Sequence, residues 1–264
     1  MTEPLILRSD VDGIATLTLN APASLNALST PMLQALDAAF TALAKDATIR
    51  VIVIRGTGRV FSAGHDLKEM QAARAAPDKG AAAFKTLFDL CTRVMTRIPA
   101  LPQPVIAQVH GLAAAAGCQL AASCDMVVAA DDARFGVNGV NIGLFCSTPM
   151  VALTRKIPAA VAFEMLTTGE FLTAPRARDV GLVNRLAPPE GLEDATLALA
   201  RTAAGKLACA VKIGKSGFYD QLGLSLDQAY AQTGAAMVEN MLWRDTDEGI
   251  AAFLEKRKPD WQQG

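Results

Sequence analysis

The chain has 264 residues, 51% of them hydrophobic, and a formal net charge of −1 at pH 7. A chain of this length forms one large core, or one domain with a smaller appendage. The balanced charge argues against nucleic acid as a partner, and the longest apolar run, residues 111–122, is too short and too mixed to span a membrane.

The cysteines and histidines indicate whether the chain binds a metal and in which cellular compartment it lies. The five cysteines are odd in number and have no short paired spacing, which is typical of reduced thiols and not of a disulfide framework. The two histidines, His65 and His110, are too few for a histidine metal site. The N-terminus shows no charged stretch followed by an apolar run. These features predict a cytoplasmic protein without a metal.

The first part of the chain alternates strand and helix signals. Strands are expected at residues 5–7 and 14–19, on either side of the turn residues Asp12-Gly13. Apolar residues at helical spacing after Pro31 predict a helix. Further along, buried strands are expected at 51–54, 105–109 and 125–129, and helices at 81–97 and 116–122. Repeating strand–turn–helix units predict an α/β core over residues 1–200.

The last part of the chain is predicted to be helical. Helices are expected at residues 149–155, 159–167, 174–180, 190–204, 208–221, 226–242 and 246–256. No low-complexity linker precedes the final region, residues 201–264. We therefore expect that region to dock on the core.

Two segments have the composition of a carbonyl-binding site. They are FSAGHDL, residues 61–67, and HGLAAAAGCQL, residues 110–120. Each runs from a strand through small residues into the start of a helix, where a ligand can approach the backbone and amides lack an internal partner. Two such amides on one oxygen form an oxyanion hole. Taken singly, each segment is better interpreted as a tight turn on the core; the pair in this order favours the hole.

Six motifs in order resemble the crotonase family, the enoyl-CoA hydratases and isomerases, over nearly the whole chain. They are LNAL (25–28), FSAGHDL (61–67), residues 104–125, residues 135–143, residues 168–183 and FLEKRK (253–258). The resemblance implies a spiral of ββα units with a helical C-terminal trimerisation region at residues 201–264, assembled as a trimer or a dimer of trimers. It also implies an acyl-CoA thioester substrate, coenzyme A as part of that substrate, no other cofactor, no metal and a role in lipid metabolism.

The same resemblance assigns residues to the site. The oxyanion donors fall on the amides of His65 and Ala116, where Ala116 replaces the usual glycine. Contacts with coenzyme A fall on Arg59 and Lys68, near its phosphates, and on Phe253 and Lys256, reaching from a neighbouring subunit. Without the motif match, Arg59 and Lys68 would be interpreted as ordinary surface charges.

The proton-transfer groups of the family hydratases are replaced in this sequence. Hydration of an enoyl thioester needs a base for water and an acid for Cα. The two family glutamates fall on Gln119 and Gly139, and a third acid position falls on Ser147. None of these three residues exchanges a proton at neutral pH.

Other polar residues of the motifs have simpler interpretations. His65 titrates near neutrality and is a possible substitute base, although a spacer that contributes only its amide is the simpler interpretation. Cys118 and Cys146 are interpreted as buried inert thiols. Asp66 is expected to cap a helix, and Asp125 is expected to be structural.

Three functions follow from this pattern. The first is an enoyl-CoA hydratase or isomerase, a lyase-type enzyme, with weak or altered activity. The second is a decarboxylase of a 2-carboxyacyl-CoA, which makes an enolate without abstracting a proton; His65 and the pair Val140-Asn141 resemble some decarboxylating relatives. The third is a non-catalytic acyl-CoA-binding protein. All three keep the thioester-binding turns.

Overall fold

The computed structural model describes residues 3–262, and its core is a six-stranded sheet. Strands β1 (Ile6–Val11) and β2 (Ile14–Leu19) form an antiparallel hairpin. Asp12 and Gly13, which join them, have φ of 52° and 74°, as a tight hairpin turn requires. The other strands run parallel: β3 (Val51–Gly56), β4 (Val105–Val109), β6 (Met126–Ala130) and β9 (Arg185–Ala187).

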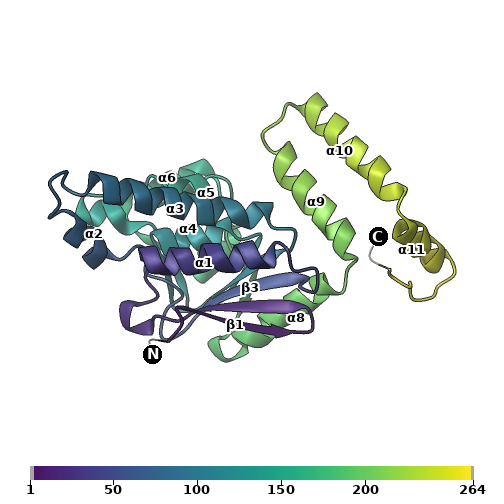
Figure 1. Cartoon of the computed structure of the whole chain (residues 1–264), viewed down its shortest axis with the longest axis horizontal. Helices are drawn as coiled ribbons and strands as arrows, with labels where there is room; N and C mark the ends of the chain where they lie inside the picture. The colour runs from purple at the N-terminus through teal and green to yellow at the C-terminus, as the bar shows by residue number, and fades with distance from the viewer. Residues whose placement is uncertain (1–2, 263–264) are drawn as a thin grey trace.

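The parallel strands are apolar because both faces of the sheet are covered. All five residues of β4 and the first four of β3 are buried. Helices α1 (Thr30–Leu43) and α3 (Ala81–Ala100) lie over one face, and α8 (Leu192–Ala204) lies against the other (Figure 1). The buried stripe of α1 contains Met32, Leu33, Leu36, Phe40 and Leu43.

A second, smaller sheet lies beside the first. It joins β5 (Leu112–Ala114), β7 (Arg134–Gly136) and β8 (Phe171–Thr173). The helices of this part are α2 (Leu67–Ala73), α4 (Ala116–Ser123), α5 (Pro149–Leu153), α6 (Ala159–Thr168) and α7 (Ala174–Asp179). Short 3₁₀ turns occur at η1 (Pro22–Ser24), η2 (Asn138–Ile142) and η3 (Pro189–Gly191).

The last three helices form an arm that projects from the core. They are α9 (Ala208–Gln221), α10 (Leu226–Met241) and α11 (Arg244–Leu254), and Figure 1 shows them extending away from the sheets. Large apolar side chains on the arm are exposed, among them Leu242 at 81% and Phe253 at 82%. Within residues 3–262, no helix is long and apolar enough to cross a membrane.

One buried ion pair fastens the arm to the core. Lys215 of α9 reaches Asp125, at the start of β6, with 2.7 Å between Nζ and Oδ2. The same ammonium donates to the carbonyl oxygens of Ile98 and Gln103, at 2.9 and 2.8 Å. Asp125 also accepts hydrogen bonds from the hydroxyl of Tyr219 and the amide of Val105. The prediction that Asp125 is structural is therefore confirmed.

The expected elements recur with small differences in their ends. The part of the chain predicted to be helical also contains two three-residue strands, β8 and β9. Helix α3 continues through Pro99 to Ala100, and the amide of Leu101 closes its last turn on the carbonyl of Arg97. Residue 200, the expected end of the core, lies within α8, which ends at Ala204.

Candidate active site

Three chain segments lie side by side at the predicted oxyanion hole. The amide of Ala114 donates to the carbonyl of Ser62 at 2.9 Å, so residues 112–114 run along residues 61–64. On the other side, the amide of Leu28 donates to the carbonyl of Gly64 at 2.7 Å. The side chain of Asn26 holds this edge, because its Nδ2 donates to the carbonyls at positions 57 and 60.

Two glycines allow the segments to come this close. Gly64 has φ of 96°, and a Cβ added there would lie 3.2 Å from the amide nitrogen of Ala116. A Cβ added at Gly117 would lie 2.4 Å from the carbonyl oxygen of Ser62, so α4 touches the strand backbone. Gly64, which precedes His65, therefore lies close to Ala116, the residue that supplies the second predicted donor.

The two predicted donor amides, those of His65 and Ala116, are free within the described residues. Ala116 begins α4, where helix amides have no internal acceptor. Neither amide nitrogen donates a hydrogen bond to another group within residues 3–262. Two such amides, brought together by the contact at Gly64, can both point at one ligand oxygen.

One strained backbone residue, Ala115, lies at the same place. Ala115, which precedes Ala116, has φ of 47° and ψ of −118°. This conformation favours glycine, so alanine there carries a conformational cost. The amide of Ala115 donates to the carbonyl of Gly136 at 2.8 Å, which holds the strained turn against β7. The backbone at the start of α4 is thus fixed rather than free to relax.

The side chain of His65 lies between the carbonyl of Leu28 and Phe88 of α3. Its Nδ1 is 3.0 Å from the carbonyl oxygen of Leu28. Its ring meets the edge of Phe88 with 5.6 Å between the ring centroids and an interplanar angle of 73°. Burial lowers the pKa of His65, while the hydrogen bond to the Leu28 carbonyl and the nearby Glu69 oppose this shift. The ring is therefore held neutral in an apolar setting.

Gln119 lies one helical turn after Ala116 and is buried. The thiol of Cys91, on α3, is 4.0 Å from its Oε1. Cys91 and Phe88 are three residues apart on α3, so they lie on one face of that helix. The same face of α3 therefore borders both Gln119 and the ring of His65.

Gly139 is in a crowded turn with no room for a longer side chain. A Cβ added there would lie 2.3 Å from the carbonyl oxygen of Leu144 and 2.8 Å from Sγ of Cys146. A glutamate at this position would therefore displace the backbone of the loop. Cys146 fills the space beside Gly139, and burial raises the pKa of its thiol.

Three further motif residues are a buried thiol, an exposed hydroxyl and a helix cap. Burial raises the pKa of Cys118 to about 12, which keeps it as an unreactive thiol. Ser147 is exposed in the loop that follows Cys146. Asp66 caps α2, since its carboxylate accepts from the amides of Lys68 and Glu69, and the predicted cap is confirmed.

The carboxylates nearest in sequence to the hole already have partners. Asp66 is engaged at the start of α2. Glu69 accepts from the amide of Thr30 at 2.9 Å and from its hydroxyl. Neither carboxylate stands in for the missing pair of glutamates.

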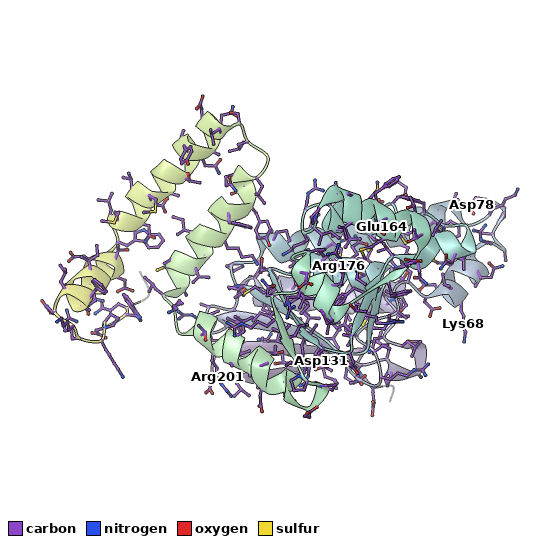
Figure 2. All side chains as sticks on the ribbon, turned by 180° about the vertical axis from the view of Figure 1, so that it is seen from behind. Lys68, Asp78, Asp131, Glu164, Arg176 and Arg201 are labelled. Atoms are coloured by element: carbon purple, nitrogen blue, oxygen red, sulfur yellow. The ribbon has the colours of Figure 1, made fainter. Side chains whose placement is uncertain are left out.

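The four predicted coenzyme A contacts do not meet within one chain. Arg59 and Lys68 are exposed on the core, whereas Phe253 and Lys256 are exposed on the arm. Figure 2 shows Lys68 at the opposite end of the molecule from the arm helices. These residues can contact one ligand only if the arm belongs to a neighbouring copy.

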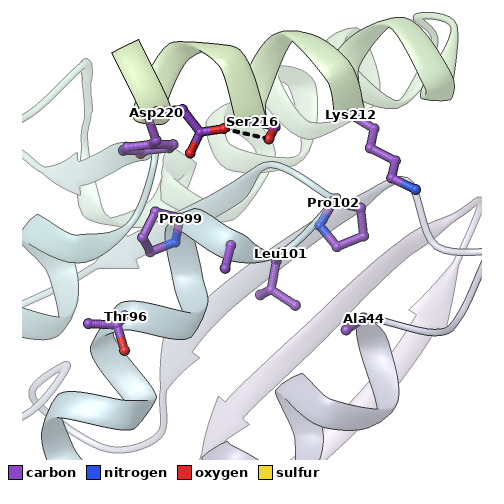
Figure 3. A pocket seen from close by; sticks show the side chains of 10 residues that line it. Ala44, Thr96, Pro99, Leu101, Pro102, Lys212, Ser216 and Asp220 are labelled. Atoms are coloured by element: carbon purple, nitrogen blue, oxygen red, sulfur yellow. Dashed lines mark hydrogen bonds between the residues drawn. The ribbon is translucent and has the colours of Figure 1, made fainter. Parts of the chain in front are cut away.

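A surface cavity lies elsewhere, where α9 crosses the ends of α1 and α3 (Figure 3). Its lining includes Pro99, Leu101 and Lys212. Ser216 and Asp220 form a hydrogen bond of 3.0 Å on its wall. Neither donor residue of the predicted hole lines this cavity.

Sequence reasoning missed the partners of His65. The carbonyl of Leu28 fixes the ring, and Phe88 packs against it. Leu28 belongs to the LNAL motif, which indicated the family but did not predict this hydrogen bond. Phe88 had no signal beyond its place in an expected helix.

Comparison with known proteins agrees with the motif analysis. The model of the enoyl-CoA hydratase/isomerase family matches residues 10–264. The human protein named enoyl-CoA hydratase domain-containing protein 3, mitochondrial, is 47% identical over 95% of this chain and 81% of its own length. The 2,3-dehydroadipyl-CoA hydratase of Escherichia coli is 35% identical over 99% of both chains.

Solved structures agree equally well. The crystal structure of an enoyl-CoA hydratase from Mycobacterium smegmatis is 50% identical, covers 98% of this chain and 99% of its own, and has a TM-score of 0.94. The human domain-containing protein 3 has a TM-score of 0.92 at 44% identity, covering 98% of this chain and 100% of its own. The family resemblance and the predicted fold class are therefore confirmed.

The relatives correct the prediction of a cytoplasmic protein. The proteins from Xenopus laevis, Homo sapiens and Danio rerio, 45–47% identical to this chain, are all named as mitochondrial. Reduced cysteines do not distinguish the cytoplasm from a mitochondrion, which is why the cysteine pattern misled. The names of these relatives therefore show that the cytoplasmic prediction is wrong.

Proposed function

Because this chain belongs to the enoyl-CoA hydratase/isomerase family, we propose that it binds an acyl-CoA thioester with the carbonyl oxygen between the amides of His65 and Ala116. The observation that supports this most is the close approach of Gly64 to Ala116, where an added Cβ would lie 3.2 Å from the amide nitrogen. It brings together two backbone donors that have no partner in residues 3–262. Donors fixed in this way stabilise negative charge on the oxygen of a thioester or its enolate.

Hydration of enoyl-CoA is weak or altered in this proposal. Gln119 can orient a water molecule, but its amide cannot accept the proton. Gly139 has no side chain, and the carbonyl of Leu144 occupies the space beside it. Each missing acid or base typically lowers the rate by about 10²–10⁴-fold. The thioester clamp is therefore retained while the usual proton-transfer groups are not.

A decarboxylase of 2-carboxyacyl-CoA is the second candidate. Loss of CO₂ breaks a C–C bond and leaves its electrons as an enolate, which the two amides hold without any base. The absence of carboxylates at positions 119 and 139 favours this reaction. Release of CO₂ from a malonyl-type CoA ester would support it. A chain that binds these esters without converting any of them is the non-catalytic acyl-CoA-binding protein.

Assembly through the arm is part of the proposal. The arm exposes apolar side chains that a neighbouring copy would cover, as a trimer or a dimer of trimers. The separation of Lys68 from the arm supports an arm donated between subunits, with Phe253 against the adenine and Lys256 at a phosphate. A monomer by light scattering at micromolar concentration would contradict this assembly.

A matched pair of ligands tests the clamp. Butyryl-CoA and its thioether analogue S-butyl-CoA have the same chain, but only the thioester has a carbonyl oxygen. Two hydrogen bonds of about 0.5–1.5 kcal/mol each predict roughly 5–150-fold tighter binding of butyryl-CoA by calorimetry. Equal affinities would remove the clamp from the proposal.

A variant adds an independent check of the second donor. Ala116→Pro deletes the amide at the first position of α4, where proline is otherwise tolerated. We expect the variant to lose part of the preference for the thioester, because only the amide of His65 remains. Circular dichroism and the thioether affinity serve as folding controls, because proline also restricts Ala115.

A further inference from the structure

We infer that His65 is the base of this site: its Nε2 removes a proton from the acyl carbon next to the thioester carbonyl. The inference rests on the proposed function, because it requires a thioester held by the two amides. It deepens that function by assigning the proton transfer to a side chain that the family pattern does not provide for.

The hydrogen bond to Leu28 fixes the tautomer of the ring. A carbonyl oxygen can only accept, so Nδ1, 3.0 Å away, carries the proton. In the neutral ring, Nε2 then has a lone pair and no proton. The backbone of residues 25–28 therefore orients the imidazole as an acceptor at Nε2, in the manner of an orienting group behind a catalytic histidine.

Nε2 has no partner among the described residues. The atom is buried and makes no hydrogen bond within residues 3–262. Buried acceptors are nearly always satisfied, so an unsatisfied one beside a candidate site requires an explanation. A bound acyl group next to the ring supplies one, because its acidic C–H hydrogen is the partner of the lone pair.

The position of the ring fits a base at the α-carbon. His65 supplies the first amide donor itself, so its side chain belongs to the residue that holds the carbonyl oxygen. Its ring packs on Phe88, and the same face of α3 brings Cys91 to the side chain of Gln119. The ring and Gln119 thus border one face of α3, and we place the α-carbon of the bound acyl group beside that face.

Burial favours the neutral form of the ring, whereas the nearby charge of Glu69 opposes it. Glu69 faces the ring from α2 and is held by Thr30. Phe88 and Cys91 lie on the face of α3 toward the ring. Burial raises the pKa of the Cys91 thiol to about 12. Residues 25–28 contribute the carbonyl of Leu28. Burial outweighs the hydrogen bond to Leu28 and the charge of Glu69 and lowers the pKa of His65, which favours a free lone pair at neutral pH.

The proposed step balances without a further reactant. The Cα–H bond breaks as the proton bonds to Nε2, and the electron pair of that bond forms the C=C of an enolate. The negative charge moves to the thioester oxygen between the amides of His65 and Ala116. Return of a proton from Nε2 to Cα regenerates the thioester, so in heavy water deuterium enters at Cα.

Deuterium incorporation into 3-butenoyl-CoA, followed by NMR, tests the inference. His65→Gln keeps the backbone amide and removes the base. We expect exchange at Cα to fall by at least about 100-fold while the affinity for butyryl-CoA by calorimetry is unchanged. His110→Gln is the matched control, because His110 bonds the carbonyl of Gly58 and has no part in the proposed step. It should exchange at the wild-type rate.

The pH profile and the binding data separate the outcomes. Wild-type exchange should decline as the pH falls through a pKa below 6.5, and His65→Gln should lack this decline. Undiminished exchange in His65→Gln, or no exchange in a wild-type protein that binds butyryl-CoA, would overturn the inference and leave the proposed function standing. Failure of the wild type to bind butyryl-CoA would overturn the proposed function itself.

Discussion

Replacing Lys215 by methionine should destabilise the chain strongly, because it leaves a buried carboxylate without its cation. The side chains of Lys215 and Asp125 are only 6% and 13% exposed and lie 2.7 Å apart. Two backbone carbonyls also lose the donor that they share. Removing one partner of a buried pair typically costs about 3–5 kcal/mol. The hydroxyl of Tyr219 and the amide of Val105 remain on Asp125, so we expect the lower part of this range.

Urea unfolding, followed by circular dichroism, measures this cost, and α9 provides its own control. Lys212 lies one turn before Lys215 on α9 but is exposed, so Lys212→Met should change the unfolding free energy by no more than about 0.5 kcal/mol. Tyr219→Phe should cost about 1–2 kcal/mol, because only one hydrogen bond is lost. If Lys215→Met is as mild as Lys212→Met, the reasoning about the anchor of the arm is refuted.

Three further changes report on the site itself. Ala115→Gly should raise the unfolding free energy in urea by up to about 1 kcal/mol, since relief of a positive φ exceeds the added entropy of the unfolded chain; a loss would show that the turn is not strained. Gly139→Ala should lower the unfolding free energy by about 1–3 kcal/mol, because its methyl group meets a backbone carbonyl; an unchanged melting temperature would contradict the crowding. The folded-state pKa of His65 is below its unfolded value near 6.5, so the unfolded chain takes up that proton first. Stability should therefore fall as the pH is lowered from 7 to 5, and His65→Gln should show a smaller fall in the same titration.

The sequence predicted most of the fold, because its signals are local. Alternating and continuous apolar runs marked β2, β3 and β4, and the turn at Asp12-Gly13 marked the hairpin. Strand β9 was not predicted, because three residues at a sheet edge are too few to show a hydrophobic periodicity. The role of Asp125 was foreseen, but its partners lie 90 and 94 residues away, at separations that no local pattern encodes.

In the candidate site, too, local features were predictable from the sequence and contacts between distant segments were not. Small residues before helix starts predicted the two donor segments, and the structure brings Gly64 against Ala116. The carbonyl that orients His65 is a backbone group, and backbone groups have no sequence signature. The crowding at Gly139 depends on how the loop returns to Leu144, which only the folded chain determines.

Hydration of crotonyl-CoA tests the central claim most directly. The claim is that the chain keeps the thioester clamp and lacks the acid and base of a two-glutamate hydratase. Purified protein, shown by calorimetry to bind butyryl-CoA, is assayed for loss of the enoyl absorbance beside a family member with glutamate at both positions. Gln119 and Gly139 predict a turnover at least about 100-fold lower than that of the relative. A turnover within about 10-fold of that of the relative would contradict the claim.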